Sequence, residues 1–314
     1  MSINIPRPPI HVITGATSGL GQHAAIALAR RGAHLVLTAR DPARADATRA
    51  LLAAAAPGAR VDFIFGDLAL MEEVRRMGAQ IADTYGRVDV LINNAGIHAF
   101  QQRLTAEGLP EMVAVNYLSP WLLTQSLRAC LLAAGSARVV NVASEASRRH
   151  GALRIPDDLT DTTPFTARES SLRYGTTKLF NIMFTAELAR RLSGTGVITN
   201  ALDPGFNVTG LGRELSFAAG LERVLRFLRI GDPRRGAGII VRLTTDPAFG
   251  EVSGGYFSVK GARPLTPAAP GADPALQAEL WEATARLLDR WGQLHGSSVV
   301  GASVRQITST ANST

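Results

Sequence analysis

The chain has 314 residues, 46% of them hydrophobic and 19% charged, which fits a globular protein with a sizeable core. The net charge of +7 comes almost entirely from arginine, because only two of the 33 basic residues are lysines, Lys178 and Lys260. The arginines are scattered and only 6% of residues are aromatic, which argues against a nucleic-acid-binding surface of stacked rings.

Targeting signals are equally sparse. No apolar run reaches the roughly 18 residues that a membrane helix needs, and the N-terminal stretch MSINIPRPPI lacks the apolar segment of a secretory signal. The single cysteine, Cys130, excludes an internal disulfide and suits a reducing compartment. We therefore expect a cytoplasmic protein without a membrane anchor, and no metal site.

From Pro9 to about Gly205, short apolar runs alternate with longer amphipathic stretches. The runs are rich in Val and Ile and flanked by turn residues, as in strands buried on both faces. Strands are expected at 10–14, 33–39, 60–66, 88–93, 137–143, 196–202 and 254–259. Helices are expected at 21–31, 42–55, 70–85, 111–134, 174–192 and 233–245. This order predicts an α/β fold, a Rossmann-like doubly wound parallel sheet of about seven strands with helices on both faces.

Two segments interrupt this alternation. Residues 147–173 follow the fifth strand without clear periodicity, and residues 206–232 follow the sixth strand and contain an amphipathic stretch. Both leave the carboxyl ends of strands, where open α/β sheets bind ligands. We expect them to build a ligand pocket. His98 and His150 are candidate lining residues, although an ordinary loop position is the simpler interpretation of each.

The C-terminal part differs in composition from the rest. We expect a dinucleotide-binding catalytic domain at residues 1–260 and an extension at 261–295 whose helix, at about 273–291, packs on that domain. Residues 296–314 are small and polar, which predicts a disordered tail.

A glycine-rich turn, TGATSGLG, joins the first expected strand to the first helix. Glycines let a backbone approach a pyrophosphate closely, and the helix N-terminus offers free N–H groups. The spacing of Gly15, Gly19 and Gly21 is one residue wider at the first gap than the usual Rossmann pattern. An ordinary turn can carry such a pattern, but its position after the first strand favours a dinucleotide site. The expected contacts are Gly15, Thr17, Ser18, Gly19, Leu20 and Gly21.

The second expected strand ends in LTAR. Sites that prefer NAD usually place an acid here to bind the ribose hydroxyls, whereas this chain has Ala39 followed by Arg40. A guanidinium can pair with a 2′-phosphate, so NADP is favoured over NAD. Two observations weigh against this: Asp41 is adjacent, and Arg40 could simply solvate the strand end.

A tyrosine and one of the two lysines share a helix face. Lys178 follows Tyr174 by four residues, and a nearby ammonium favours tyrosinate, which brings a tyrosine toward the range for proton transfer. Ser144 ends the fifth strand at the same expected sheet edge and could donate a hydrogen bond to a developing oxyanion. Taken singly, Tyr174 and Lys178 could be a pair on a helix surface, and Ser144 could be a helix cap. Because all three follow a nucleotide-binding turn, we favour a catalytic role for them.

Together these motifs resemble the short-chain dehydrogenase/reductase family over about residues 9–260. The resemblance implies that Asp67 and Leu68 contact the adenine, that Asn94, Ala95 and Gly96 border the adenosine ribose, and that Asn116 supports a proton relay. It also implies an active site of Ser144, Tyr174 and Lys178, with Lys178 on the nicotinamide ribose, and a nicotinamide cap formed by Pro204, Gly205 and Thr209.

Within that family the chain most resembles the retinol-dehydrogenase-like branch, and LVLTARD is similar to NADPH-dependent carbonyl reductases. It departs from the branch in having no hydrophobic N-terminal anchor. Asp203 stands where the branch often has histidine, and Asn207 replaces a common valine. Because both are expected on the substrate side, retinoid specificity cannot be carried over.

The resemblance implies an NADP(H)-dependent oxidoreductase that interconverts a small-molecule carbonyl and an alcohol, with Tyr174 as general acid/base. A homodimer or homotetramer through the helices at 111–134 and 174–192 is expected, with a monomer as the alternative. Two rivals remain. A sugar epimerase or dehydratase would usually space its glycines G-x-x-G-x-x-G, and an NADP-binding regulator would not need Ser144, Tyr174 and Lys178.

Overall fold

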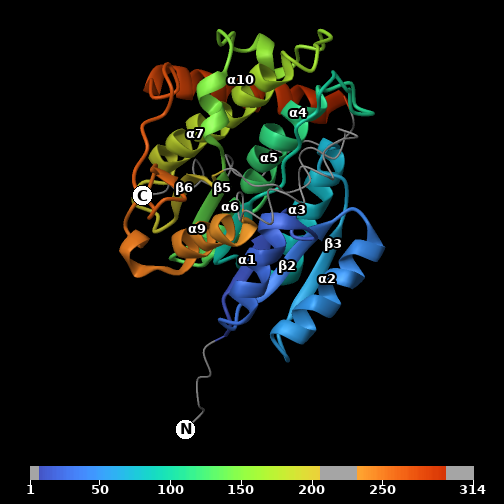
Figure 1. The fold of residues 1–314 in the computed structure, drawn as a ribbon, viewed down its shortest axis with the longest axis vertical. Coiled ribbons are helices and arrows are strands. Elements are labelled where there is room, and N and C mark those ends of the chain that lie inside the picture. Colours follow the sequence, from blue (N-terminus) through green and yellow to red (C-terminus); the bar gives the residue numbers. More distant parts are fainter. Residues whose placement is uncertain (1–6, 206–231, 295–314) are drawn as a thin grey trace, which may run out of the picture.

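The computed structural model describes residues 7–205 and 232–294, which contain one seven-stranded parallel sheet (Figure 1). The strand order is β3-β2-β1-β4-β5-β6-β7, so the chain winds outward from β1, returns, and winds outward again from β4. This is the predicted doubly wound fold. In such folds ligands bind where the strand order reverses, which is between β1 and β4 here. The strands are β1 (Ile10–Ile13), β2 (His34–Ala39), β3 (Val61–Phe65), β4 (Val90–Asn93), β5 (Arg138–Val142), β6 (Ile198–Asp203) and β7 (Tyr256–Ser258).

Helices cover both faces of the sheet (Figure 1). Because successive strand side chains point to opposite faces, Leu91 joins the core under one helix layer, while Val90 and Ile92 join the other core. The first layer holds α3 (Met71–Tyr85), α5 (Ser119–Ser126), α6 (Arg128–Ala133), α7 (Ser170–Arg191) and α10 (Pro274–Leu294). The second holds α1 (Gly19–Ala29), α2 (Pro42–Ala55) and α9 (Pro233–Thr245).

One strand differs from the prediction that all are buried on both faces. β3 lies at the edge of the sheet, and Asp62 and Phe65 on it are exposed. The Asp62 carboxylate accepts a hydrogen bond from the Tyr85 hydroxyl at 2.7 Å and lies 2.7 Å from the His34 ring. The apolar run RVDFIFG predicts a strand that is buried on both faces. The local sequence does not show that this strand lies at the edge of the sheet.

The single helix expected over residues 111–134 is broken. The chain forms a short turn, α4 (Glu111–Val113), then a π-helical turn (Ala114–Leu118), then α5 and α6 with a break at Leu127. Pro120 supplies the reason for the first break, because proline has no N–H to give to the carbonyl four residues earlier, that of Asn116. In addition, α7 begins at Ser170, four residues before the expected start.

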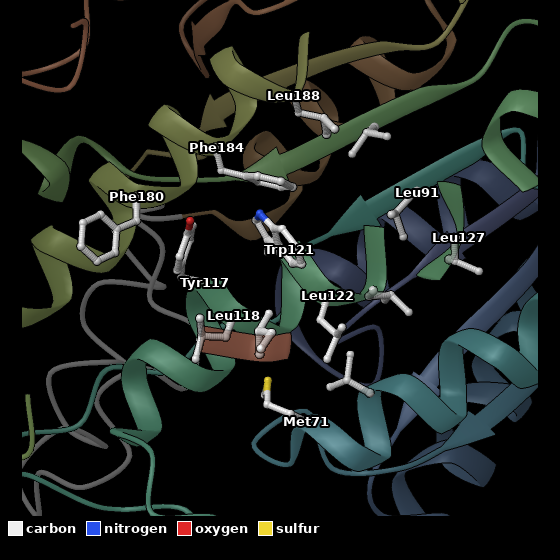
Figure 2. Packing of buried hydrophobic residues seen from close by; sticks show 14 of the residues in the cluster. Met71, Leu91, Tyr117, Leu118, Trp121, Leu122, Leu127, Phe180, Phe184 and Leu188 are labelled. Atoms are coloured by element: carbon white, nitrogen blue, oxygen red, sulfur yellow. The ribbon is translucent and has the colours of Figure 1, made fainter. Parts of the chain in front are cut away.

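The C-terminal helix α10 packs over α5 and α7. Trp281 lies against Trp121 and stacks on Phe184, with ring centroids 5.3 and 5.8 Å apart, and Thr284 bonds the buried Tyr117 hydroxyl at 2.8 Å. Figure 2 shows the α5 and α7 side of this aromatic cluster. These side chains are buried within one chain, so an oligomer formed through α5 and α7 would have to use other residues of those helices.

Among the described residues, no helix combines the length and the apolar composition that a membrane crossing requires.

Candidate active site

The glycine-rich turn folds back closely on the end of β4. Gly15 and Gly19 have φ values of +66° and +56°, in the left-handed region that favours glycine. At Gly21 an added Cβ would lie 2.5 Å from the carbonyl oxygen of Gly15 and 2.5 Å from the side-chain nitrogen of Asn94. The turn therefore leaves no room for a side chain where a pyrophosphate would have to approach the backbone.

Hydrogen bonds from β1 hold the segment after β4. The hydroxyl of Thr14 accepts from the backbone N–H groups of Asn94 and Ala95, each at 3.0 Å. The Asn94 amide donates to the carbonyls of Thr14 and Gly15 at 2.9 and 3.1 Å. Two of the expected cofactor segments, the glycine-rich turn and Asn94-Ala95-Gly96, are thus joined by hydrogen bonds at the point where the strand order reverses.

The N-terminus of α1 has no side-chain cap. Ser18 occupies the capping position, but its hydroxyl makes no capping hydrogen bond. Uncapped N–H groups and the helix dipole favour an anion at this position. Leu20, at the same helix end, packs against Gly236 of α9, where no side chain would fit. Thr17 is partly buried and Ser18 exposed at the open side of this turn.

The end of β2 presents a cation to solvent. The Arg40 side chain is 73% exposed and forms a long ion pair with Asp67, at 3.4 Å between Nη1 and Oδ2. Asp41, whose proximity weighed against NADP, points into α2, where its carboxylate accepts from the N–H of Ala43 at 2.9 Å. Leu68, the residue after Asp67, is partly buried and packs against the core.

Asn116 lies in the π-helical turn and is fully buried. Its amide group pairs with the backbone of Ile97, accepting from the N–H at 2.8 Å and donating to the carbonyl at 2.9 Å. It also donates to the Thr177 hydroxyl at 3.0 Å, and its own carbonyl accepts from Asn181 at 2.7 Å. Asn116 therefore joins the segment after β4 to α7, and its carbonyl is free to do so because Pro120 cannot bond it.

Lys178 is buried below this junction. Its ammonium donates to the carbonyl of Val142 at 2.9 Å, and burial lowers its pKa to about 8. Exposed Gly96 lies above it: an added Cβ there would be 3.3 Å from both Lys178 Nζ and Asn116 Oδ1. A ribose approaching the Gly96 backbone would thus come close to the ammonium.

Ser144 follows β5 directly and caps a 3-10 turn (Glu145–Arg149) by accepting from the N–H of Ala146 at 3.1 Å. The cap uses a lone pair of the hydroxyl oxygen and leaves its proton for another acceptor. α7 packs directly on this turn, because Gly175, whose Cβ would lie 2.6 Å from the Ala146 carbonyl, has no side chain. Gly175 thus brings Tyr174 next to the Ser144 turn.

Tyr174 is half-buried on α7, with Lys178 Nζ 5.6 Å from its ring centroid. Burial, and then the nearby Asp203 carboxylate, raise the pKa of Tyr174 above its usual range. This direction is opposite to the lowering expected from Lys178. The physical reason is that Lys178 donates to Val142 rather than to the phenol, while desolvation penalises the phenolate.

Comparison with known proteins identifies the family. A model of the short chain dehydrogenases matches residues 9–156. The "Putative daunorubicin C-13 ketoreductase DnrU" of Streptomyces sp. (strain C5) is 38% identical over 276 residues, covering 87% of this chain and 90% of that protein. Retinol dehydrogenase 13 of Homo sapiens is 33% identical over 284 residues, covering 88% of this chain and 83% of that protein. The chain belongs to the short-chain dehydrogenase/reductase family.

A solved structure adds to this. A variant of actinorhodin polyketide ketoreductase with NADPH superposes with a TM-score of 0.62 at 26% identity, covering 80% of this chain and 95% of that one. As a short-chain dehydrogenase/reductase with these relatives, the chain is an oxidoreductase that interconverts carbonyl and alcohol groups, and its fold accommodates a nicotinamide cofactor.

The remaining predicted site residues of this dehydrogenase/reductase are only partly described. Pro204 and Gly205 follow β6, and Gly205 has a φ of +73°. Thr209 and Asn207, together with the amphipathic stretch after them, lie outside the described residues.

A cleft of about 500 Å³ lies between the long segment that follows β5 and the first turn of α7. It is lined by Arg154, Asp157, Thr160, Asp161, Thr162, Thr163 and Arg173. The cleft is polar and is lined by neither Ser144 nor Tyr174, so it is distinct from the predicted active-site residues. His150 does not line it; its ring nitrogens lie near the carbonyls of Gly151 and Ala269, at 2.6 and 2.8 Å.

Sequence reasoning missed several residues that shape the site. Thr14 begins the glycine-rich turn and Gly175 lies between Tyr174 and Lys178, and neither was given a role. Pro120, four residues after Asn116, was a readable signal for a freed carbonyl. Asp203 was noted only as a departure, yet its buried carboxylate accepts from the N–H of Glu145 at 3.0 Å and so holds the turn that begins with Ser144.

Proposed function

We propose that the protein is an NADPH-dependent reductase that converts a ketone or aldehyde to an alcohol, with Tyr174 as the general acid. The supporting observation is the packing of α7, which carries Tyr174 and Lys178, on the turn that begins with Ser144. Lys178 lies close to Gly96, and the preceding residue, Ala95, contacts Gly15 of the glycine-rich turn. The close backbone approach at Gly21 and the uncapped N-terminus of α1 fit the pyrophosphate of a dinucleotide.

The roles follow from these contacts. The nicotinamide, when bound, supplies the hydride to the carbonyl carbon. Ser144 donates its hydroxyl proton in a hydrogen bond to the carbonyl oxygen, and Tyr174 transfers its phenol proton to that oxygen as negative charge develops. A raised phenol pKa keeps Tyr174 protonated at neutral pH, which suits reduction. Lys178 orients the nicotinamide ribose, and Asn116 holds the segment above it.

The test is Tyr174→Phe, which removes the transferable proton and keeps the ring. We expect NADPH-dependent turnover to fall by roughly 100-fold or more, while the Kd for NADPH measured by fluorescence titration changes little. Tyr85→Phe, at the distant sheet edge, is the matched control and should leave turnover unchanged. Turnover within a few-fold of wild type in Tyr174→Phe would refute the assignment.

For the cofactor, we propose that Arg40 selects NADPH over NADH through the 2′-phosphate. Its exposed guanidinium and the commitment of Asp41 to α2 support this. Arg40→Asp should weaken NADPH binding by roughly tenfold or more and leave NADH binding nearly unchanged. Arg128→Asp makes the same charge change and serves as the control. Arg128 lies on α6, and the Val88 N–H donates to the carbonyl of Cys130 on that helix, just before β4 begins, so Arg128 lies toward the amino ends of the strands and not the carboxyl ends. Equal effects of both variants would remove the role given to Arg40.

For the substrate, we propose a carbonyl attached to a bulky, mostly apolar ring system. Two related proteins are named for daunorubicin and retinol, and here the Tyr174 ring packs with Ile97, Ala99, Met112 and Phe165. Polycyclic aromatic ketones should therefore be reduced with a kcat/KM at least about tenfold above that of short aliphatic ketones of equal reactivity. A preference for the short ketones would contradict this substrate class.

A further inference from the structure

Three rings from two separate segments form a continuous stack at the proposed active site. The His98 imidazole lies on the face of Tyr174, with ring centroids 4.6 Å apart and an interplanar angle of 18°. Phe100 lies against the same imidazole at 4.8 Å with a tilt of 33°. The imidazole is therefore in contact with the catalytic phenol ring itself and with a further aromatic ring.

Hydrogen bonds fix the imidazole in this position. His98 Nε2 lies 3.1 Å from the hydroxyl of Ser170, the first residue of α7. That hydroxyl donates its only proton to the carbonyl of Ala167 at 2.7 Å, so it accepts from His98. Nε2 consequently carries a proton, and the ring plane is set by a residue that is itself fully buried.

This arrangement constrains Tyr174 where the helix alone does not. Tyr174 lies in the second turn of α7, and its side chain leaves the helix toward the loop after β4. Rotation about its first side-chain torsion would move the hydroxyl by several ångström, and misplacement by about 1 Å can cost roughly 100-fold in rate. A flat ring held against one face restricts that rotation without touching the hydroxyl.

We propose that His98 is a positioning residue that holds the Tyr174 ring in its reactive orientation by stacking, and that Ser170 and Phe100 hold His98 in turn. The inference rests on the proposed role of Tyr174 and adds to it a residue of the loop after β4. The stacking partner must be flat and of this size, whereas the imidazole needs no proton-transfer role.

Three variants separate stacking from the hydrogen bond. His98→Ala removes both, and His98→Phe keeps a flat ring and removes the bond. Ser170→Ala keeps the imidazole and removes its bond to Ser170, together with the Ser170 bond to Ala167. With NADPH and a substrate in saturating amounts, we expect kcat to fall roughly tenfold or more in His98→Ala and no more than about threefold in the other two. The Kd for NADPH should stay within about twofold of wild type in all three.

A readout independent of turnover tests the packing. Nitration of Tyr174 by tetranitromethane, followed by peptide mass spectrometry, should be several-fold faster in His98→Ala than in wild type and unchanged in His98→Phe. Tyr85, far from the stack, gives the internal reference. Should Tyr174→Phe keep its turnover, the proposed function fails, while the nitration result still decides whether the stack exists.

Loss of kcat in His98→Phe equal to that in His98→Ala would overturn the proposal, because a flat ring would then not suffice. A kcat of His98→Ala within twofold of wild type would overturn it as well. Melting temperatures show whether each variant is folded. If His98→Ala does not fold, a large loss of kcat in His98→Phe relative to wild type still overturns the proposal.

Discussion

The two halves of the site at the carboxyl edge of the sheet are built by different means. Around β1, β2 and β4, the proposed cofactor half is made of backbone: left-handed glycines, an uncapped helix end and close approaches that no side chain could enter. Around β5, β6 and α7, the proposed chemical half is made of buried polar side chains, among them Asn116, Lys178 and Asp203. The first half is specified over a few adjacent residues, the second by contacts between distant ones.

This difference predicts different responses to substitution. Backbone close approaches fail as soon as an atom is added, because neighbouring backbone cannot move aside. Buried polar groups respond to removal of charge, through desolvation and pKa, often without loss of the fold. The predictions below compare the two responses, from the largest expected effect to the smallest.

Gly21→Ala should have the largest effect. The added Cβ would lie 2.5 Å from the Gly15 carbonyl, so the glycine-rich turn must open and the Kd for NADPH should rise by roughly 100-fold. Gly238→Ala is the matched control: it is also a helical glycine, but its Cβ meets open space. That control should leave NADPH binding unchanged and raise the free energy of unfolding by about 0.5–1 kcal/mol. Comparable binding losses in both variants would contradict the backbone argument.

Lys178→Met should separate stability from activity in the chemical half. Because burial lowers the Lys178 pKa to about 8, the unfolded chain binds more protons than the folded one between about pH 8 and the ordinary lysine pKa. The cost of the buried charge is fully present below that window and disappears as pH rises through it. At pH 7, Lys178→Met should therefore raise the free energy of unfolding by about 2 kcal/mol, net of the lost bond to Val142.

Denaturant unfolding at pH 7 and pH 10 measures this, and the advantage of Lys178→Met should shrink at the higher pH. Turnover should be lost at both. If Lys178→Met were less stable than wild type at pH 7, the contacts of the ammonium would stabilise the fold by more free energy than its burial costs.

The same contrast explains how much of the molecule the sequence could predict. The seven strands, the doubly wound parallel sheet and the glycine-rich turn could be predicted from local patterns, because alternation of apolar runs and glycine spacing are short-range signals. The exposure of Asp62 and the cover of α10 over Trp121 depend on which elements become neighbours, and no local pattern contains that. The break after Asn116 lies between: Pro120 was visible, but helical periodicity outweighed it.

In the proposed site, candidate residues could be selected from the sequence, but the contacts that they make could not. Tyr174 and Lys178 could be selected from spacing and from the rarity of lysine. That Lys178 would bond Val142, and that Asp203 would hold the Ser144 turn and raise the Tyr174 pKa, required the register of β5 and β6. His98, which the sequence favoured as an ordinary loop residue, stacks on Tyr174 because the loop after β4 crosses the start of α7.

Substitutions of Asp203 should have the smallest and most selective effect in the chemical half. Its carboxylate both accepts from the N–H of Glu145 and contributes to the raised pKa of Tyr174. Asp203→Asn keeps an acceptor oxygen for Glu145 and removes the charge, so the Tyr174 pKa should fall. Because alcohol oxidation needs the phenolate, the pH at which the oxidative kcat is half-maximal should move to lower pH, and oxidation near pH 8 should rise by roughly two- to threefold. Asp203→Ala also removes the acceptor, frees the Ser144 turn and should lower kcat across the whole pH range. If the two variants gave the same profile, Asp203 would act only by holding that turn, and the electrostatic half of its effect on Tyr174 would have to be abandoned.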